Sequence, residues 1–122
     1  MTLNITDFFN DIRRAAGISS APEAQRAFMR ALLATLGEVN PRWGTEYAVD
    51  DEETPTGSIT INNYEFAAIT QGVRYYLQQS GAWAMDTDSE AWSKFDIQTR
   101  RAIGSAIAED EDFLTRNSVP DE

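Results

Sequence analysis

The stretch DTDSEAWSKFD opens with Asp86, Asp88 and Glu90 at the alternating spacing with which a calcium-binding loop begins. A twelve-residue loop starting at Asp86 needs a glycine at its sixth position and a bidentate carboxylate at its twelfth, and these positions hold Ala91 and Ile97. Acidic residues also favour the first turn of a helix, because they cap it and complement its dipole. The sequence therefore favours a helix capped by Asp86 or Asp88 over a metal site.

The composition disfavours catalysis. The 122 residues contain no cysteine and no histidine, so thiol nucleophiles, disulfides and histidine-based proton transfer or metal binding are all excluded. Gly72 and Gly104 stand alone, so no phosphate-binding loop is indicated. No spacing brings two carboxylates together as an acid and base pair. We expect a protein that is not an enzyme and that needs no cofactor or metal.

The net charge of −10 and the pI of about 4.3 oppose non-specific binding to nucleic acid. Acidic runs at 50–53 and 109–112 are typical of solvated loops and tails. No segment is apolar enough to cross a membrane, which predicts a soluble chain without a membrane partner. Nine of the ten basic residues are arginine. They either pair on helix surfaces, for example Glu23 with Arg26 or Arg30, or make subunit contacts.

Two helices are predicted in the first third of the chain. A short helix covers residues 7–16, with Thr6 as its N-cap. The second opens with Ser20 and Glu23 at capping-box spacing, carries an apolar stripe with helical period, and is expected to end at Pro41. Glycines that stop helices are expected at Gly17 and Gly81.

The periodicity changes to two between Trp43 and Ile61. Tyr47 and Val49 share one face of a short strand, and Ile59 and Ile61 share one face of another. The residues DEETPTG between them are turn formers. We predict a hairpin arm near residues 45–61. Because a two-stranded ribbon is marginal alone, the arm packs on the helices or on another subunit.

Two further helices complete the fold. The third begins at Asn62 and Glu65, again at capping-box spacing, and the fourth runs from about Asp88 to about Ala108. The fold class is mainly α: a small bundle of about four helices with one β-hairpin between helices 2 and 3, in a single domain over residues 1–108. Residues 109–122 are predicted to be an acidic flexible tail. The predicted core consists of Phe28, Leu32, Phe66, Ile69, Val73, Tyr76, Leu77, Trp92, Phe95 and Ile103.

The order of these parts resembles a known family. The stretches LLATLGEVNPRWG, SITINNYEFAAITQGVRYYLQQSGAWA and SEAWSKFDIQTRRAIGSAI resemble head-tail connector proteins of tailed bacteriophages, also called adaptor or head-completion proteins. The resemblance covers roughly residues 21–108 and leaves out the first helix. The positions that match the family pattern are Tyr64, Ala68, Gly72, Tyr75, Tyr76, Leu77, Trp92 and Phe95.

The resemblance implies a virion protein of the neck region that is present in the host cytoplasm during assembly. It implies a homo-oligomeric ring, matched to the portal protein and expected as a dodecamer, that extends the DNA channel and receives a downstream neck or tail protein. DNA would pass through the ring without sequence-specific binding, including during genome ejection. The hairpin arm would reach neighbouring subunits. The tail would bind the portal through Phe113, Leu114, Arg116 and Val119.

Two alternatives from other functional classes remain open. An acidic inhibitor that mimics DNA would also have a low pI, but it should spread its carboxylates along one face. A small protein-interaction module with a hydrophobic groove would explain Phe8, Phe9 and Trp43 equally well.

Overall fold

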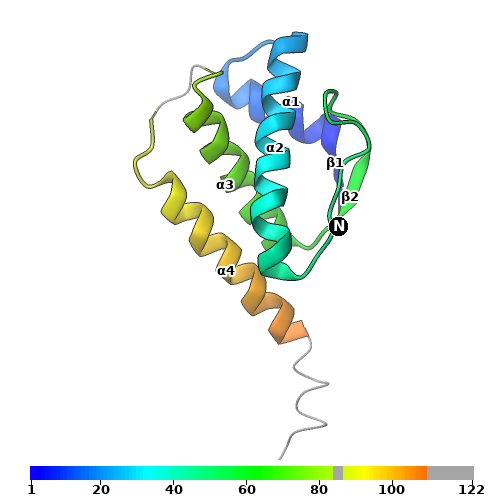
Figure 1. Cartoon of the computed structure of the whole chain (residues 1–122), viewed down its shortest axis with the longest axis vertical. Coiled ribbons are helices and arrows are strands. Elements are labelled where there is room, and N and C mark those ends of the chain that lie inside the picture. Colours follow the sequence, from blue (N-terminus) through cyan, green and yellow to red (C-terminus); the bar gives the residue numbers. More distant parts are fainter. Residues whose placement is uncertain (84–86, 110–122) are drawn as a thin grey trace, which may run out of the picture.

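The computed structural model describes residues 1–83 and 87–109, with side chains as far as Gly104, and within these residues it contains four helices and a two-stranded sheet (Figure 1). Helices α2, α3 and α4 lie side by side, α1 crosses behind the upper part of α2, and the sheet lies on the side of α2 away from α4 (Figure 1). The predicted fold class, a mainly α bundle of about four helices with one antiparallel strand pair and a strand between helices 2 and 3, is confirmed. The elements in chain order are β1 Thr2–Asn4, α1 Ile5–Ala16, α2 Pro22–Trp43, β2 Ser58–Thr60, α3 Asn63–Ser80 and α4 Ala91–Glu109.

The strand that pairs with β2 differs from the expected one. Strands β1 and β2 are antiparallel, with Leu3 opposite Ile59, and both of these side chains are buried. The pairing continues past the strands, because the backbone N–H of Ile61 donates to the carbonyl oxygen of Met1 at 2.9 Å. The N-terminus therefore supplies the partner strand that we had assigned to residues 45–49.

Residues 45–57 form a loop without a strand within this described segment, and of the two packing partners predicted for the arm, the helices of its own chain are the ones it contacts. The Asn40 side chain accepts from the backbone N–H of Tyr47 at 3.0 Å and donates to its carbonyl oxygen at 2.9 Å. The Tyr47 hydroxyl donates to Glu65 Oε1 at 2.8 Å. Val49 packs against the core. Hydrogen bonds to one asparagine thus replace the sheet pairing that the alternating pattern suggested.

The capping box predicted at the start of α3 is confirmed. Asn62 Oδ1 accepts from the backbone N–H of Glu65 at 2.8 Å, and Glu65 Oε1 accepts from the backbone N–H of Asn62 at 3.0 Å. The prediction for α1 is wrong by two residues. Asn4 is its N-cap, accepting from Asp7 N at 3.0 Å, while the Thr6 hydroxyl donates to the carbonyl oxygen of Pro55.

Both predicted ends of α2 need correction. Its N-cap is Ala21, which has no side-chain capping bond, so the Ser20 and Glu23 box is not formed. At the other end the helix passes through Pro41 and stops at Gly44, whose φ of 69° suits glycine. Pro41 has no N–H to donate to the preceding turn, but Arg42 and Trp43, which follow it, both bond to residues of α4.

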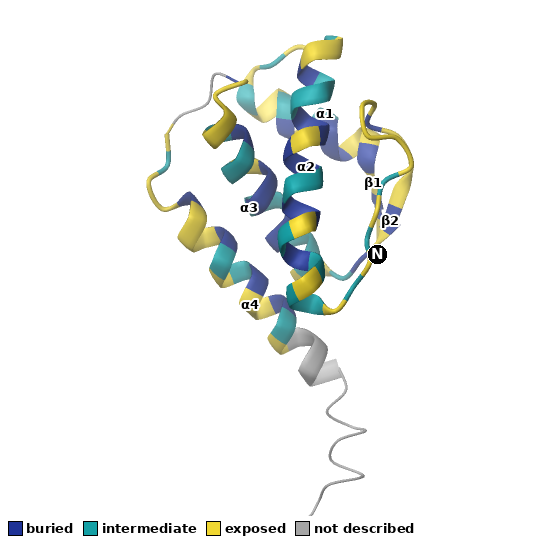
Figure 2. Ribbon diagram, viewed as in Figure 1, coloured by how far each residue is buried: buried dark blue, intermediate teal, exposed yellow. Residues whose placement is uncertain are grey.

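A continuous core joins all the elements that the structure describes (Figure 2). Of the predicted core residues, Phe66 and Tyr76 are partly buried and pack on this core, and Ile103 is half-buried. Ile59 and Ile61, assigned to inter-subunit contacts, belong to the core of their own chain and are not available to a neighbour. The predicted core residues that are fully buried are Phe28, Leu32, Ile69, Val73, Leu77 and Phe95.

Candidate functional site

The approach to α4 shows what the Asp88 carboxylate does. Its Oδ1 accepts from the backbone N–H of Glu90 at 2.9 Å, and its Oδ2 pairs with Lys94 Nζ at 2.6 Å. The hydrogen bond from Lys94, and next the one from Glu90, hold the pKa of Asp88 below its usual value. This carboxylate therefore acts as a cap for the turn that leads into α4. Asp86 lies outside the described residues, and no group of three possible metal-binding side chains converges within the described part of the chain.

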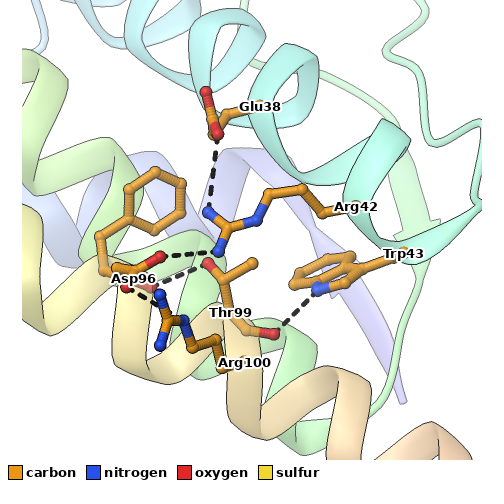
Figure 3. A network of polar contacts seen from close by, with 7 residues as sticks. Glu38, Arg42, Trp43, Asp96, Thr99 and Arg100 are labelled. Atoms are coloured by element: carbon orange, nitrogen blue, oxygen red, sulfur yellow. Dashed lines mark hydrogen bonds and ion pairs between the residues drawn. The ribbon is translucent and has the colours of Figure 1, made fainter.

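Arg42 links the C-terminal end of α2 to the middle of α4 (Figure 3). Its Nη2 donates to Asp96 Oδ1 at 2.6 Å, and its Nη1 lies 3.5 Å from Glu38 Oε2. The other oxygen of Asp96 pairs with Arg100 Nε at 3.2 Å. The charges of these four side chains alternate in sign, so each arginine lies beside a carboxylate that holds its position.

A second contact at the same place joins Trp43 to α4. The Trp43 indole N–H donates to the carbonyl oxygen of Thr99 at 3.1 Å (Figure 3). A carbonyl oxygen has two lone pairs, so it can accept more than one hydrogen bond. Thr99 itself is buried, and its hydroxyl donates to the carbonyl oxygen of Phe95 at 2.8 Å. Together with Arg42, this contact fixes the direction in which α4 leaves the bundle.

Acid is expected to weaken this link between α2 and α4. The hydrogen bond from Arg42 lowers the pKa of Asp96, and the charge of Arg100 acts in the same direction against the cost of partial burial. A carboxyl whose pKa is lowered by folding stabilises the protein above its unfolded pKa of about 3.9, and this contribution is lost as the pH falls through the folded value. Urea unfolding at pH 7 and at about pH 3 should therefore show a smaller acid loss in Asp96→Asn than in the unmodified chain.

The charge-matched control for this experiment is Glu46→Gln, in the loop after α2. An equal acid loss in Asp96→Asn and the unmodified chain would show that the Arg42 pairing contributes nothing to folding.

Trp92 lies outside the core, contrary to the prediction. Its side chain is 42% exposed, and its ring centroid lies 5.1 Å from that of Tyr75 and 5.5 Å from that of Phe95. Helix α4 buries Ala91, Phe95, Thr99 and Ala102, which follow the helical period, and Trp92 is rotated away from that line by one residue. The predicted core position is therefore confirmed at Phe95 and wrong at Trp92.

Replacing Trp92 by alanine is expected to lower the free energy of unfolding by only about 1 kcal/mol, the size of a partly exposed ring pair. The matched variant Phe95→Ala, which removes a fully buried ring, should cost about 3 to 5 kcal/mol. Urea unfolding of the two variants checks the comparison. Equal losses would place Trp92 in the core after all.

A groove lies between the N-terminal half of α2 and the C-terminal end of α3. It consists of two adjoining hollows of about 460 and 330 Å³ that share Ala27, Arg30 and Ala82. Alanines of α2 form its floor, and we call it the alanine groove. Trp83 lines one end, where its buried indole N–H finds no acceptor in the described part of the chain. The groove is also lined by Glu23, Arg26, Ala31, Ala34 and Tyr76.

The structure brings together few of the residues predicted to act in binding. Phe113, Leu114, Arg116 and Val119, assigned to the portal, lie outside the described residues. Tyr47 and Val49, assigned to an arm, pack on their own core.

Two features were missed by sequence reasoning. The pairing of Arg42 with Asp96 joins residues 54 positions apart, and no local pattern signals it. The alanine groove had a signal, because Ala24, Ala27, Ala31 and Ala34 recur at helical spacing. Small residues on one face of a helix leave a groove wherever no neighbouring side chain fills the space above them.

No protein-family model, curated protein or solved structure matches this chain. Among the helices that the structure describes, none is long and apolar enough to cross a membrane.

Proposed function

We propose that this chain is a head-tail connector, or adaptor, protein of a tailed bacteriophage. In this role it docks on the portal as a ring, extends the DNA channel and joins the capsid to the neck or tail. The proposal rests on the family resemblance of residues 21–108 together with the arrangement of α2, β2, α3 and α4, which follow one another in one packed unit.

The course of α4 is the observation that carries the proposal. Helix α4 packs on α3 along its first half, is linked to α2 by Arg42 and Trp43, and then continues past the end of α2 (Figure 1). A helix held in this way brings Glu109, where α4 ends, to one pole of the molecule. That position suits a segment that reaches into another ring, as the connector role requires.

The acidic surface is compatible with a DNA channel. The net charge is −10, and residues 50–53 are exposed in the loop before β2. Negative charge repels the phosphates of a duplex in transit and disfavours tight binding to it. A wall that repels DNA lets the duplex slide.

Deleting residues 109–122 is expected to weaken binding to the portal of the phage that encodes the chain by at least about tenfold, which is 1.4 kcal/mol. The reason is that this segment carries the proposed portal contacts Phe113, Leu114, Arg116 and Val119. Co-sedimentation with purified portal rings measures the loss, and circular dichroism should show nearly unchanged helicity. Equal binding by the shortened chain would contradict the assignment of the tail.

The alanine groove favours a second candidate, a small protein-interaction module. A groove lined by alanines with two arginines at its rim can hold a peptide without any ring. The two functions differ in the portal experiment, since a module of this kind has no reason to bind portal rings.

A further inference from the structure

We infer that the alanine groove binds the acidic segment EDEDFL, residues 109–114, of a second copy of this chain. This inference deepens the proposed function, on which its biological role rests, because it supplies a contact between neighbouring subunits of the ring. Its test uses the free protein and needs no portal.

The groove differs in charge from the chain as a whole. The chain carries −10, yet the charged side chains that line the groove are Arg26, Arg30 and Glu23, which leave one positive charge. The ion pairs formed within the described residues engage Arg42, Arg100 and Lys94, and neither Arg26 nor Arg30 takes part in them. The predicted pairing of these two arginines with Glu23 is thus not among the observed ion pairs.

The segment matches the groove in both charge and polarity. Its first four residues are acidic, and Phe113 and Leu114 follow directly. The acidic residues can pair with the two arginines at the rim. The floor, made of Ala27, Ala31 and Ala34 beside the Tyr76 ring, offers apolar surface to the two large side chains.

The same copy cannot supply Phe113. The bond of Trp43 to Thr99 fixes α4 beside the C-terminal end of α2. Arg30 lies thirteen residues earlier on α2, about 20 Å away along the helix axis. Beyond this contact α4 runs away from the N-terminal half of α2, where Arg30 lies (Figure 1). Phe113 follows Glu109 by four residues, which span at most about 14 Å. The occupant therefore comes from a second copy.

A contact of this kind has a defined symmetry. The groove lies at the end of the bundle where α2 begins, and α4 ends at the opposite pole (Figure 1). One copy then presents its groove and the next its segment, which is a heterologous interface, and such interfaces close into rings or grow as filaments. In the proposed ring Phe113 and Leu114 then act in the contact between subunits and not at the portal, and the portal contacts are Arg116 and Val119.

A charge exchange between two variants tests the inference by sedimentation velocity over a concentration series, without portal. One variant carries Arg26→Glu and Arg30→Glu, and the other carries Asp110→Arg and Asp112→Arg. The unmodified chain should self-associate. Each variant alone should raise the dissociation constant at least about tenfold. An equimolar mixture should restore association, because the unaltered grooves of one variant then meet the unaltered acidic segments of the other, and the altered grooves meet segments whose charge at residues 109–112 has changed from −4 to zero.

The matched control carries Arg74→Glu and Arg101→Glu, which make the same charge change at exposed positions away from the groove. It should associate like the unmodified chain, and circular dichroism should show that all variants keep their helices. A monomeric unmodified chain at every concentration, undiminished association of either variant, or a folded mixture that stays dissociated would overturn the inference. If portal docking persists in any of these cases, the proposed function stands, whereas restored association without portal docking leaves the groove contact and removes the connector role.

Discussion

Replacing Phe28 by alanine is expected to lower the free energy of unfolding by about 3 to 5 kcal/mol. Phe28 is fully buried on α2, and its ring centroid lies 5.5 Å from that of Phe8 and 5.2 Å from that of Phe9, both in edge-to-face geometry. Removing the ring leaves a cavity and takes away both ring pairs, through which α1 is packed on α2. Domains of this size are stable by about 5 to 15 kcal/mol, so this variant should lose a large share of its stability.

Phe28→Leu is the matched control, because it keeps most of the apolar volume and should lose clearly less stability than the alanine variant. Urea unfolding followed by circular dichroism gives both values. A loss below about 1 kcal/mol for Phe28→Ala would show that α1 does not depend on this ring.

Replacing Gly72 by leucine is expected to separate α3 from its two neighbours. A Cβ atom at this position would lie 2.5 Å from Thr35 Cγ2 and 2.8 Å from Phe95 Cε1. Both neighbours are fully buried, and the Thr35 hydroxyl is already bonded to the carbonyl oxygen of Ala31 at 2.8 Å, so neither can move cheaply. Overpacking typically lowers the free energy of unfolding by about 1 to 3 kcal/mol. A whole leucine side chain should exceed that range, because the Thr35 and Phe95 side chains already lie against the glycine.

Gly37→Leu in the interior of α2 is the matched control, since a Cβ there meets no atom within 4 Å. It should be neutral or stabilise the protein by up to about 1 kcal/mol, because glycine is a poor helix former. Thermal unfolding of the two variants separates close packing from helix propensity. Equal melting temperatures would contradict the close contact of α3 with α2 and α4.

The features that the sequence predicts best are those set by a few adjacent residues. The capping box of Asn62 and Glu65 is local, and so is the end of α3 at Gly81, whose φ is 67°. The end of α1 at Gly17 is of the same kind. The four helices follow from such signals together with their apolar stripes.

The features that the sequence predicts poorly depend on distant partners. Strand β1 has three residues, too few for an alternating pattern, and it exists because Leu3 pairs with Ile59 across more than fifty residues. The helix passes through Pro41 because the turn that follows makes contacts with α4, which lies far along the chain. Trp92 shows a third cause, since one position along a helix is a rotation of about 100° around its axis, which places Trp92 on the surface beside the buried line of Ala91 and Phe95.

The candidate surfaces divide in the same way. The sequence suggests the acidic character of the C-terminal segment, because composition alone reveals it. The groove that we match to it requires α2 and α3 to meet at their small residues, and the cationic character of its rim depends on which arginines remain outside ion pairs. Those properties arise only when the helices are packed.

Electron microscopy of the chain mixed with portal rings of the same phage tests the connector proposal most directly. The proposal predicts an added ring of density, coaxial with the channel, at the outer end of the portal, and the loss of that density when residues 109–122 are deleted. Portal rings that stay bare at their outer end, in preparations where DNA packaging is complete, would contradict it.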